Sequence, residues 1–150
     1  MKALISHKLR TVIKLNKHQK LLLLEAFIFL AWARLMKVIP FKRLAPMLGN
    51  HMNESTYEDI PSMTGILRYV SSALHIMSKY TFWESECLVK AIAGMKMLQR
   101  RGIESTLYLG TAKDENGKMI AHAWLRSGTY YVSGAEEMKR FTVVSKFANK

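Results

Sequence analysis

The hydrophobic pattern of this 150-residue chain changes at Gly102, and the change decides the fold class. Before Gly102, apolar residues recur every three or four positions, which is the period of helices that bury one face. After it, apolar and polar residues alternate in short runs between turn residues, the pattern of strands. Helices followed by strands predict an α+β domain with an antiparallel sheet rather than repeated βαβ units.

The helical part divides at proline, glycine and capping signals. Pro40 ends the first segment, and Pro61 suits the start of the third. Thr81 has capping-box spacing to Glu84, and Ser85 is a second candidate N-cap for the last segment. The expected helices cover about 17–38, 41–48 and 61–79, and the last runs from Thr81 or Ser85 to Gln99.

The last helix is expected to end at Gly102, because glycine accepts the left-handed conformation that closes many helices. The alternating runs after it predict four strands, over about 103–109, 119–125, 129–132 and 141–147, with turns at 114–117 and 127–128. With 150 residues and a hydrophobic fraction of 49%, we expect one domain. Residues 1–55 would form its helical N-terminal part and residues 60–150 its core.

The first expected helix is apolar on more than one side. One set of apolar residues follows helical spacing, and a second set makes the neighbouring flank apolar as well. These sets are Leu21, Leu24, Ile28, Ala31, Leu35 and Val38, and Leu22, Ala26, Phe29 and Ala33. Such a helix is either buried in its own domain or covered by a partner.

The net charge is +12 and is concentrated in the first third of the chain. Residues 1–53 hold ten basic side chains and one acid, Glu25, a net charge of +9. A basic region of this kind can meet nucleic acid, an anionic membrane surface or an acidic peptide, and charge alone does not choose among them.

A single cysteine excludes an intramolecular disulfide framework, and the five histidines are too scattered in sequence for a metal site. We therefore expect a reduced, cytoplasmic protein with no metal and no cofactor. The apolar run over residues 20–33 imitates a secretory signal, but Glu25 interrupts it and the helical pattern continues beyond it. The run is also short for a membrane span.

Cys87 lies near the start of the last helix under either choice of N-cap. A helix N-terminus presents positive potential and free N–H groups, which stabilise a thiolate and an oxyanion. Small residues at Ala91 and Gly94 would let a sheet approach this helix closely. The alternative is that Cys87 is a small hydrophobic core residue.

His122 lies within an expected strand, on the same face as Ile120 and Trp124. By itself it could be a core histidine bonded to a backbone carbonyl. A cysteine at a helix start followed by a histidine on a later strand is also the order of papain-like thiol chemistry. In that chemistry the imidazole takes the thiol proton, the thiolate attacks a carbonyl, and the imidazolium protonates the leaving amine.

Four stretches, taken in this order, carry a resemblance to a known family. They are Trp83-Glu-Ser-Glu-Cys-Leu-Val-Lys-Ala91, Met97-Leu-Gln-Arg-Arg-Gly-Ile103, Leu107-Tyr-Leu-Gly110 and Ala121-His-Ala-Trp-Leu125. The chain resembles the transglutaminase-like peptidases of lasso peptide biosynthesis, the stand-alone protease half of the split lasso B protein. The Leu-rich first helix followed by Pro40 and Phe41 extends the resemblance over nearly the whole chain.

The resemblance implies removal of the leader from a ribosomally synthesised lasso precursor, with Cys87 as nucleophile and His122 as base. The papain-like or transglutaminase-like core would then occupy residues 60–150. The family's third catalytic member is an acid about a dozen residues after the histidine, where this chain has Gly134. Glu136 and Glu137 are the nearest acids, and Asp114 lies in a turn before the histidine strand. A backbone carbonyl or an amide could also orient the imidazole.

The family resemblance also implies partners. In the family a separate recognition protein binds the leader and delivers it, and an ATP-dependent macrolactam synthetase closes the ring on the freed core. The apolar, basic N-terminal part is then a candidate docking surface for the recognition protein or the leader. Its alternative role is a core helix with solvated lysines.

Trp83 and Trp124 flank the proposed nucleophile and base in sequence, so they are candidates for the walls of a substrate cleft or for core packing. Two other functions stay open. One is a basic binding module without catalysis, although no nucleic-acid motif is present and we expect no nucleic-acid partner. The other is a thiol acyltransferase, in which an amine instead of water resolves the acyl-enzyme.

Overall fold

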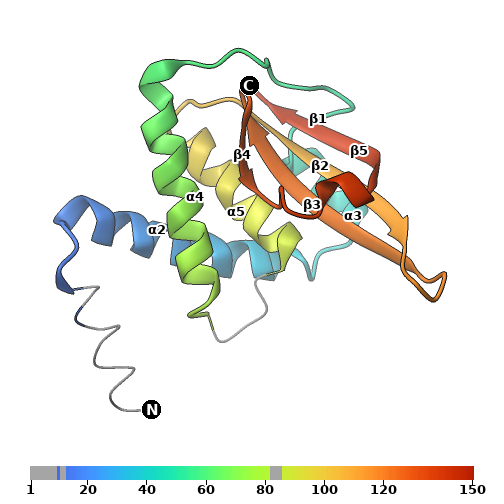
Figure 1. The fold of residues 1–150 in the computed structure, drawn as a ribbon, viewed down its shortest axis with the longest axis horizontal. Helices are drawn as coiled ribbons and strands as arrows, with labels where there is room; N and C mark the ends of the chain where they lie inside the picture. The colour runs from blue at the N-terminus through green and yellow to red at the C-terminus, as the bar shows by residue number, and fades with distance from the viewer. Residues whose placement is uncertain (1–9, 11–12, 82–85) are drawn as a thin grey trace.

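Helices cover one face of an antiparallel sheet in the computed structural model, which describes residues 10, 13–81 and 86–150 (Figure 1). The predicted α+β class is confirmed. The helices are α2 (Lys17–Met36), α3 (Phe41–Leu44), α4 (Thr64–Ser78) and α5 (Cys87–Gln99), with 3-10 turns η1 (Ala45–Met47), η2 (Pro61–Met63) and η3 (Met138–Arg140). The strands are β1 (Asn50–His51), β2 (Ser105–Lys113), β3 (Met119–Ser127), β4 (Tyr130–Ser133) and β5 (Thr142–Asn149).

The sheet has the strand order β1-β5-β2-β3-β4, and each neighbouring pair is antiparallel. Asp114 closes the β2–β3 hairpin, because its side chain accepts hydrogen bonds from the N–H groups of Asn116 and Lys118, each at 2.9 Å. The expected strand positions are confirmed to within a few residues. β1 was not predicted, since two residues leave no alternation to read.

The ends of α5 were predicted with mixed success. At its C-terminus, Gly102 has φ 65°, and its N–H donates to Gln99 O while the N–H of Ile103 donates to Leu98 O. This is the expected glycine ending. At its N-terminus the expectation of Thr81 as N-cap was wrong: the cap is Glu86, in extended conformation, so the helix begins one and a half turns later. The other candidate, Ser85, is outside the described residues.

α5 is the central helix of the domain. It packs against the sheet on one side and against α2 and α4 on the other, and it contributes more buried residues than any other described helix. Gly94 makes the close approach possible: a Cβ there would lie 2.8 Å from Leu125 Cδ2 and 2.9 Å from Leu74 Cδ1. Leu125 of the sheet and Leu74 of α4 therefore both contact α5 at Gly94.

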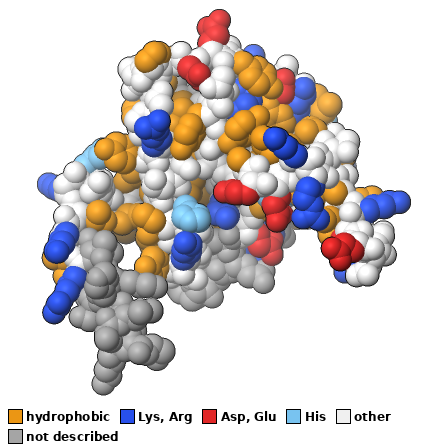
Figure 2. Space-filling view, in the orientation of Figure 1, with side chains coloured by type: hydrophobic (Ala, Val, Ile, Leu, Met, Phe, Trp, Pro, Cys, Tyr) orange, Lys and Arg blue, Asp and Glu red, His pale blue; other side chains and the backbone are white. Residues whose placement is uncertain are grey.

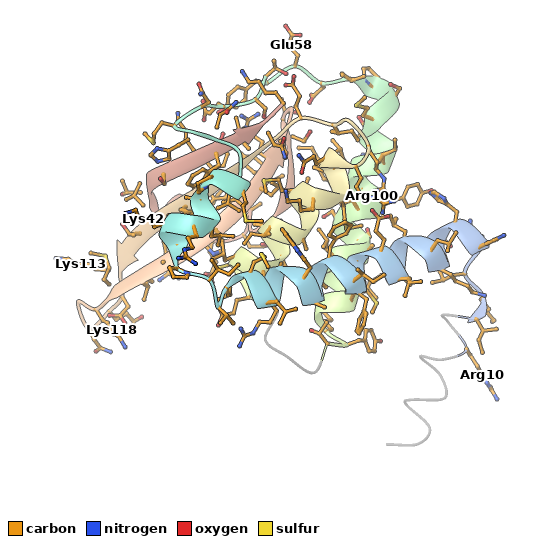
Figure 3. All side chains as sticks on the ribbon, turned by 180° about the vertical axis from the view of Figure 1, so that it is seen from behind. Arg10, Lys42, Glu58, Arg100, Lys113 and Lys118 are labelled. Carbon is orange, nitrogen blue, oxygen red and sulfur yellow. The ribbon has the colours of Figure 1, made fainter. Side chains whose placement is uncertain are left out.

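α2 buries one face and exposes another (Figure 3). The buried face consists of Leu22, Ala26, Leu30 and Ala33. The exposed face, together with Val38 just past the end of the helix, forms what we call the α2 stripe: Leu21, Leu24, Ile28, Leu35 and Val38, each more than half exposed. Of the two predicted apolar sets, the second is therefore mostly the core side, and the first, apart from the half-buried Ala31, is mostly exposed. Within the described part of the chain, no helix is both long and apolar enough to cross a bilayer.

Glu25 joins α2 to the end of α5. Its carboxylate accepts hydrogen bonds from Arg101 Nη1 and Nη2, each at 2.7 Å, and Arg100 Nη1 lies 3.0 Å away. The hydrogen bonds from Arg101 lower the pKa of Glu25 from its ordinary value of 4.5, against an opposing effect of burial. The lone acid of the N-terminal part is thus used for helix packing.

Replacing Glu25 by Gln should destabilise the fold, because it leaves Arg101 without its anionic partner. We expect the free energy of unfolding at neutral pH to fall by about 1–3 kcal/mol, measured by urea denaturation. A lowered pKa in the folded state gives stability that is present above pH 4.5 and is lost as the pH falls through that lowered value. Glu25→Gln should therefore weaken the acid dependence of stability.

A matched control is Glu137→Gln. Glu137 pairs with Arg140 at 4.0 Å, with both side chains more than half exposed. Exposed pairs of this kind contribute about 0–1 kcal/mol, so this variant should unfold almost as the wild type does. Equal effects of the two substitutions would show that Glu25 is only a surface charge.

Candidate active site

Cys87 is the first residue of α5. Its side chain is partly buried against the hydrophobic core, and it is a free thiol. Glu86, which precedes it, makes no side-chain capping hydrogen bond and instead pairs with Lys37, just past the end of α2. The prediction that Cys87 stands at a helix start is confirmed, and its thiol lies where the helix dipole favours negative charge.

His122 lies in β3, and its ring is bonded to the backbone of Gly134: the distance from Nε2 to the carbonyl oxygen is 2.7 Å. A carbonyl oxygen only accepts hydrogen bonds, so Nε2 must donate and carry the proton. In the neutral imidazole the other nitrogen, Nδ1, is then the basic one. The backbone of Gly134 fixes the tautomer that a general base needs.

Aromatic side chains hold the His122 ring in place. Its centroid lies 5.7 Å from the ring of Trp124 and 5.0 Å from that of Phe141. Trp124 is itself stacked on Tyr108, with 5.5 Å between centroids, and is only 5% exposed. Trp124 thus supports the imidazole and offers little surface of its own to a substrate. Trp83, the other predicted cleft residue, is outside the described residues.

His122 lies on the face of the sheet that points away from α5. Leu125 contacts α5, so the alternation of β3 turns His122 and Trp124 toward the opposite face. β4 pairs only with the last three residues of β3, from Leu125 onward. The edge of β3 at His122 therefore has no pairing with β4, and the segment after β4 lies beside it. No hydrogen bond joins Cys87 to His122 among the described residues, and their pairing stays a prediction.

Gly134 fills the open edge and explains why no acid stands there. It has φ 78°, and a Cβ at this position would lie 2.5 Å from Ala123 O and 2.8 Å from Trp124 Cβ. The backbone therefore crosses β3 too closely for any side chain. Where the resemblance predicts a carboxylate, this chain brings a carbonyl oxygen to the imidazole.

The acids considered as a third member are not bonded to the ring. Within the described parts of the chain, no hydrogen bond joins His122 to Glu136 or Glu137, and both acids are exposed. Asp114 is used in the β2–β3 turn. The observed partner is the backbone carbonyl that the sequence left open as an alternative.

Arg126 continues the face of His122 and Trp124 and was missed by the sequence reasoning. It is 1% exposed, and its guanidinium donates to Tyr108 Oη at 2.9 Å, to Thr56 O at 2.9 Å and to Ser55 O at 3.1 Å. It also stacks over the ring of Tyr57 at 3.6 Å. Arg126 thereby fixes the segment before α4 on the outer face of the sheet. The alternation of β3, which places it beside Trp124, was the available signal.

Glu54 and Tyr108 form a hydrogen-bonded pair next to Arg126. The Tyr108 hydroxyl donates to Glu54 Oε1 at 2.7 Å, and this bond lowers the pKa of the Glu54 carboxyl. Burial raises the pKa of Tyr108, and so do its bonds to Tyr57 and Glu54. Glu54, Tyr108 and Arg126 thus form a hydrogen-bonded network on the outer face of the sheet, and Tyr108 stacks on Trp124.

Replacing Gly134 by Ala should displace the carbonyl that holds His122. We expect a loss of stability of about 2–4 kcal/mol, because left-handed strain adds to the contact with β3. The catalytic rate should fall by more than the loss of folded protein accounts for. Thermal unfolding and activity at a temperature where both proteins are folded measure the two effects.

Gly117→Ala is the matched control for Gly134→Ala. Gly117 has φ 75°, nearly that of Gly134, but nothing lies within 4 Å of a Cβ there. Its substitution should cost only the left-handed strain of about 1–2 kcal/mol and leave turnover near the wild-type rate. Equal effects at the two glycines would mean that the close approach to β3 is unimportant.

Comparison with known proteins relates the chain to a family. A family model described as transglutaminase-like superfamily matches residues 31–146, which include Cys87, His122 and Gly134. No curated protein and no solved structure matches the chain. The matched region begins within α2 and ends within β5, so it covers the helix layer and the sheet together.

Proposed function

Since this chain belongs to the transglutaminase-like superfamily, we propose that it is a cysteine peptidase that removes the leader from a lasso peptide precursor. Thiol enzymes of this superfamily act on acyl groups, as peptidases or acyltransferases. The observation that carries the catalytic part is the bond from His122 Nε2 to Gly134 O, which leaves Nδ1 as a base. The lasso precursor as substrate rests on the resemblance of the four sequence stretches.

The proposed reaction uses Cys87 and His122 in two steps. Nδ1 of His122 takes the thiol proton, and the thiolate adds to the carbonyl of the leader–core amide. The N-terminus of α5 stabilises the negative oxygen, and the imidazolium gives its proton to the amine of the departing core. Water activated by His122 then hydrolyses the thioester, releasing the leader as a carboxylate and restoring the thiol.

The proposal includes a separate leader-recognition protein that docks on the α2 stripe. Five large aliphatic side chains on one helical face are more than half exposed, which is unusual for a surface without a partner. Basic residues border the stripe, among them Lys17, Lys20 and Arg34. This combination favours a partner surface that is apolar at its centre and acidic at its rim. An ATP-dependent macrolactam synthetase would then use the freed core.

Mass spectrometry of a lasso-type precursor, incubated with the protein and a matched recognition protein, tests the reaction. We expect one cut at the leader–core junction, no detectable cut with Cys87→Ala, and a rate lower by about a thousandfold or more with His122→Ala. Glu136→Gln and Glu137→Gln should each lower the rate less than about fivefold, because a carbonyl orients the ring. A loss of about a hundredfold in either would identify a catalytic carboxylate instead.

Other results would favour the remaining functions. Leader binding without any cut, unaffected by Cys87→Ala, would favour a basic binding module. Transfer of the acyl group to an added amine in preference to water would favour a thiol acyltransferase, and the product mass distinguishes these two enzymes.

Replacing Leu24 by Asp should weaken docking without unfolding the protein, since Leu24 is 55% exposed. We expect the KM for the recognition protein–precursor complex to rise by about tenfold or more, as when a charge enters an apolar interface, with kcat less affected. Ile60→Asp is the matched control, because Ile60 is 53% exposed and lies before α4, away from α2. If Leu24→Asp and Ile60→Asp behave alike, the α2 stripe is not the docking surface.

A further inference from the structure

A polar cavity of about 310 Å³ lies where α4, the first turns of α5 and the chain after β4 meet. Figure 2 shows acidic and basic side chains, with a histidine, gathered across the middle of this face. Its lining includes Ser71, His75, Lys90, Ser133, Gly134 and Glu136. No role has been assigned to this cavity by the reaction described above.

The cavity has a lining residue that relates to each of the two candidate catalytic residues. Gly134 lines it and also binds His122 through its carbonyl oxygen. Lys90 lines it and lies three residues after Cys87 on α5, a spacing that puts the two side chains on the same face of the helix. A peptide whose carbonyl meets Cys87 therefore has a neighbouring residue within reach of the cavity.

The charges in the cavity favour an anion. Lys90 is partly buried and has no ion pair within the described parts of the chain, and the exposed His75 lines the same cavity from α4. Glu136 is the acid of the cavity, but it is exposed and does not pair with Lys90, so water screens its charge. Lys90 is therefore a cation that lacks a counter-ion among the described residues of the cavity.

The walls also leave a polar atom unused. Ser133 Oγ is buried and has no hydrogen-bond partner among the described residues, whereas Ser71 Oγ donates to Val132 O at 2.7 Å. A buried hydroxyl without a partner is rare in folded proteins, since it loses its bonds to water. A bound polar group would supply the missing partner of Ser133.

We propose that this cavity is a specificity subsite for an acidic side chain next to the scissile bond, with Lys90 as its counter-ion. The inference rests on the proposed peptidase function. Lys90 pairs with the substrate carboxylate, and Ser133 Oγ donates a hydrogen bond to the same group. The acidic residue fixes the register of the peptide so that one carbonyl lies over Cys87.

Charge reversal on both sides tests the subsite. Precursor variants carry Asp, Asn or Lys at a single position, which is one of the two residues before the cut or one of the two after it. The kcat/KM of each variant is measured by mass spectrometry. At one position the wild type should cleave the Asp variant about tenfold faster than the Asn variant, the effect of one charged pair. Lys90→Glu should reverse this order in favour of Lys, and Lys90→Gln should abolish it.

Lys139→Glu is the control, because Lys139 is exposed in η3 and outside the cavity. It makes the same change of net charge and should keep the wild-type preference. Cleavage of all variants without a preference for Asp, or a preference unchanged in folded Lys90→Gln, would overturn the subsite and leave the peptidase function standing. Cleavage of none by the wild type would overturn the peptidase function, and the subsite with it.

Discussion

The burial of α5 is the constraint on which the other elements depend. Eight of its thirteen residues are buried, and both layers of the domain contact it. Small residues at the contact favour this enclosure, and Gly94 meets Leu125 and Leu74 so closely that a methyl group there would make both leucine side chains shift. The rigid placement of α5 in turn fixes its first residue, Cys87, at the border between the layers.

A second constraint acts on the sheet, where the chain after β4 crosses β3 at Gly134. The crossing is close enough to exclude a side chain and brings a carbonyl oxygen to His122. A carbonyl and a carboxylate both accept the Nε2 proton and so fix the same tautomer. They differ in charge, because only the carboxylate would stabilise the imidazolium electrostatically. A thiol nucleophile requires less of this assistance than a hydroxyl does.

Ion pairs hold both ends of α5. At the C-terminus of α5, Glu25 is used to bind Arg101, so the lone acid of the basic N-terminal part is not free to attract other groups. At the N-terminus of α5, Lys37 pairs with Glu86 next to Cys87. α2 is therefore tied to both ends of the helix that bears the thiol, while its outer face stays apolar and exposed. A partner on the α2 stripe would be one helix away from Cys87.

The sequence by itself determined the class of fold, most element positions, the helix-start position of Cys87 and the strand position of His122. These follow from periodicity and capping, which are local properties of the chain. Local pattern did not determine the true start of α5, since Thr81 has good capping chemistry yet α5 begins at Cys87. It also could not tell which apolar face of α2 is buried, because both faces have the same period. Only the tertiary structure decided that face, the burial of Arg126 and the contact of Gly134 O with His122. Each of these depends on which segments distant in sequence pack together, and packing is set by the fit of whole surfaces.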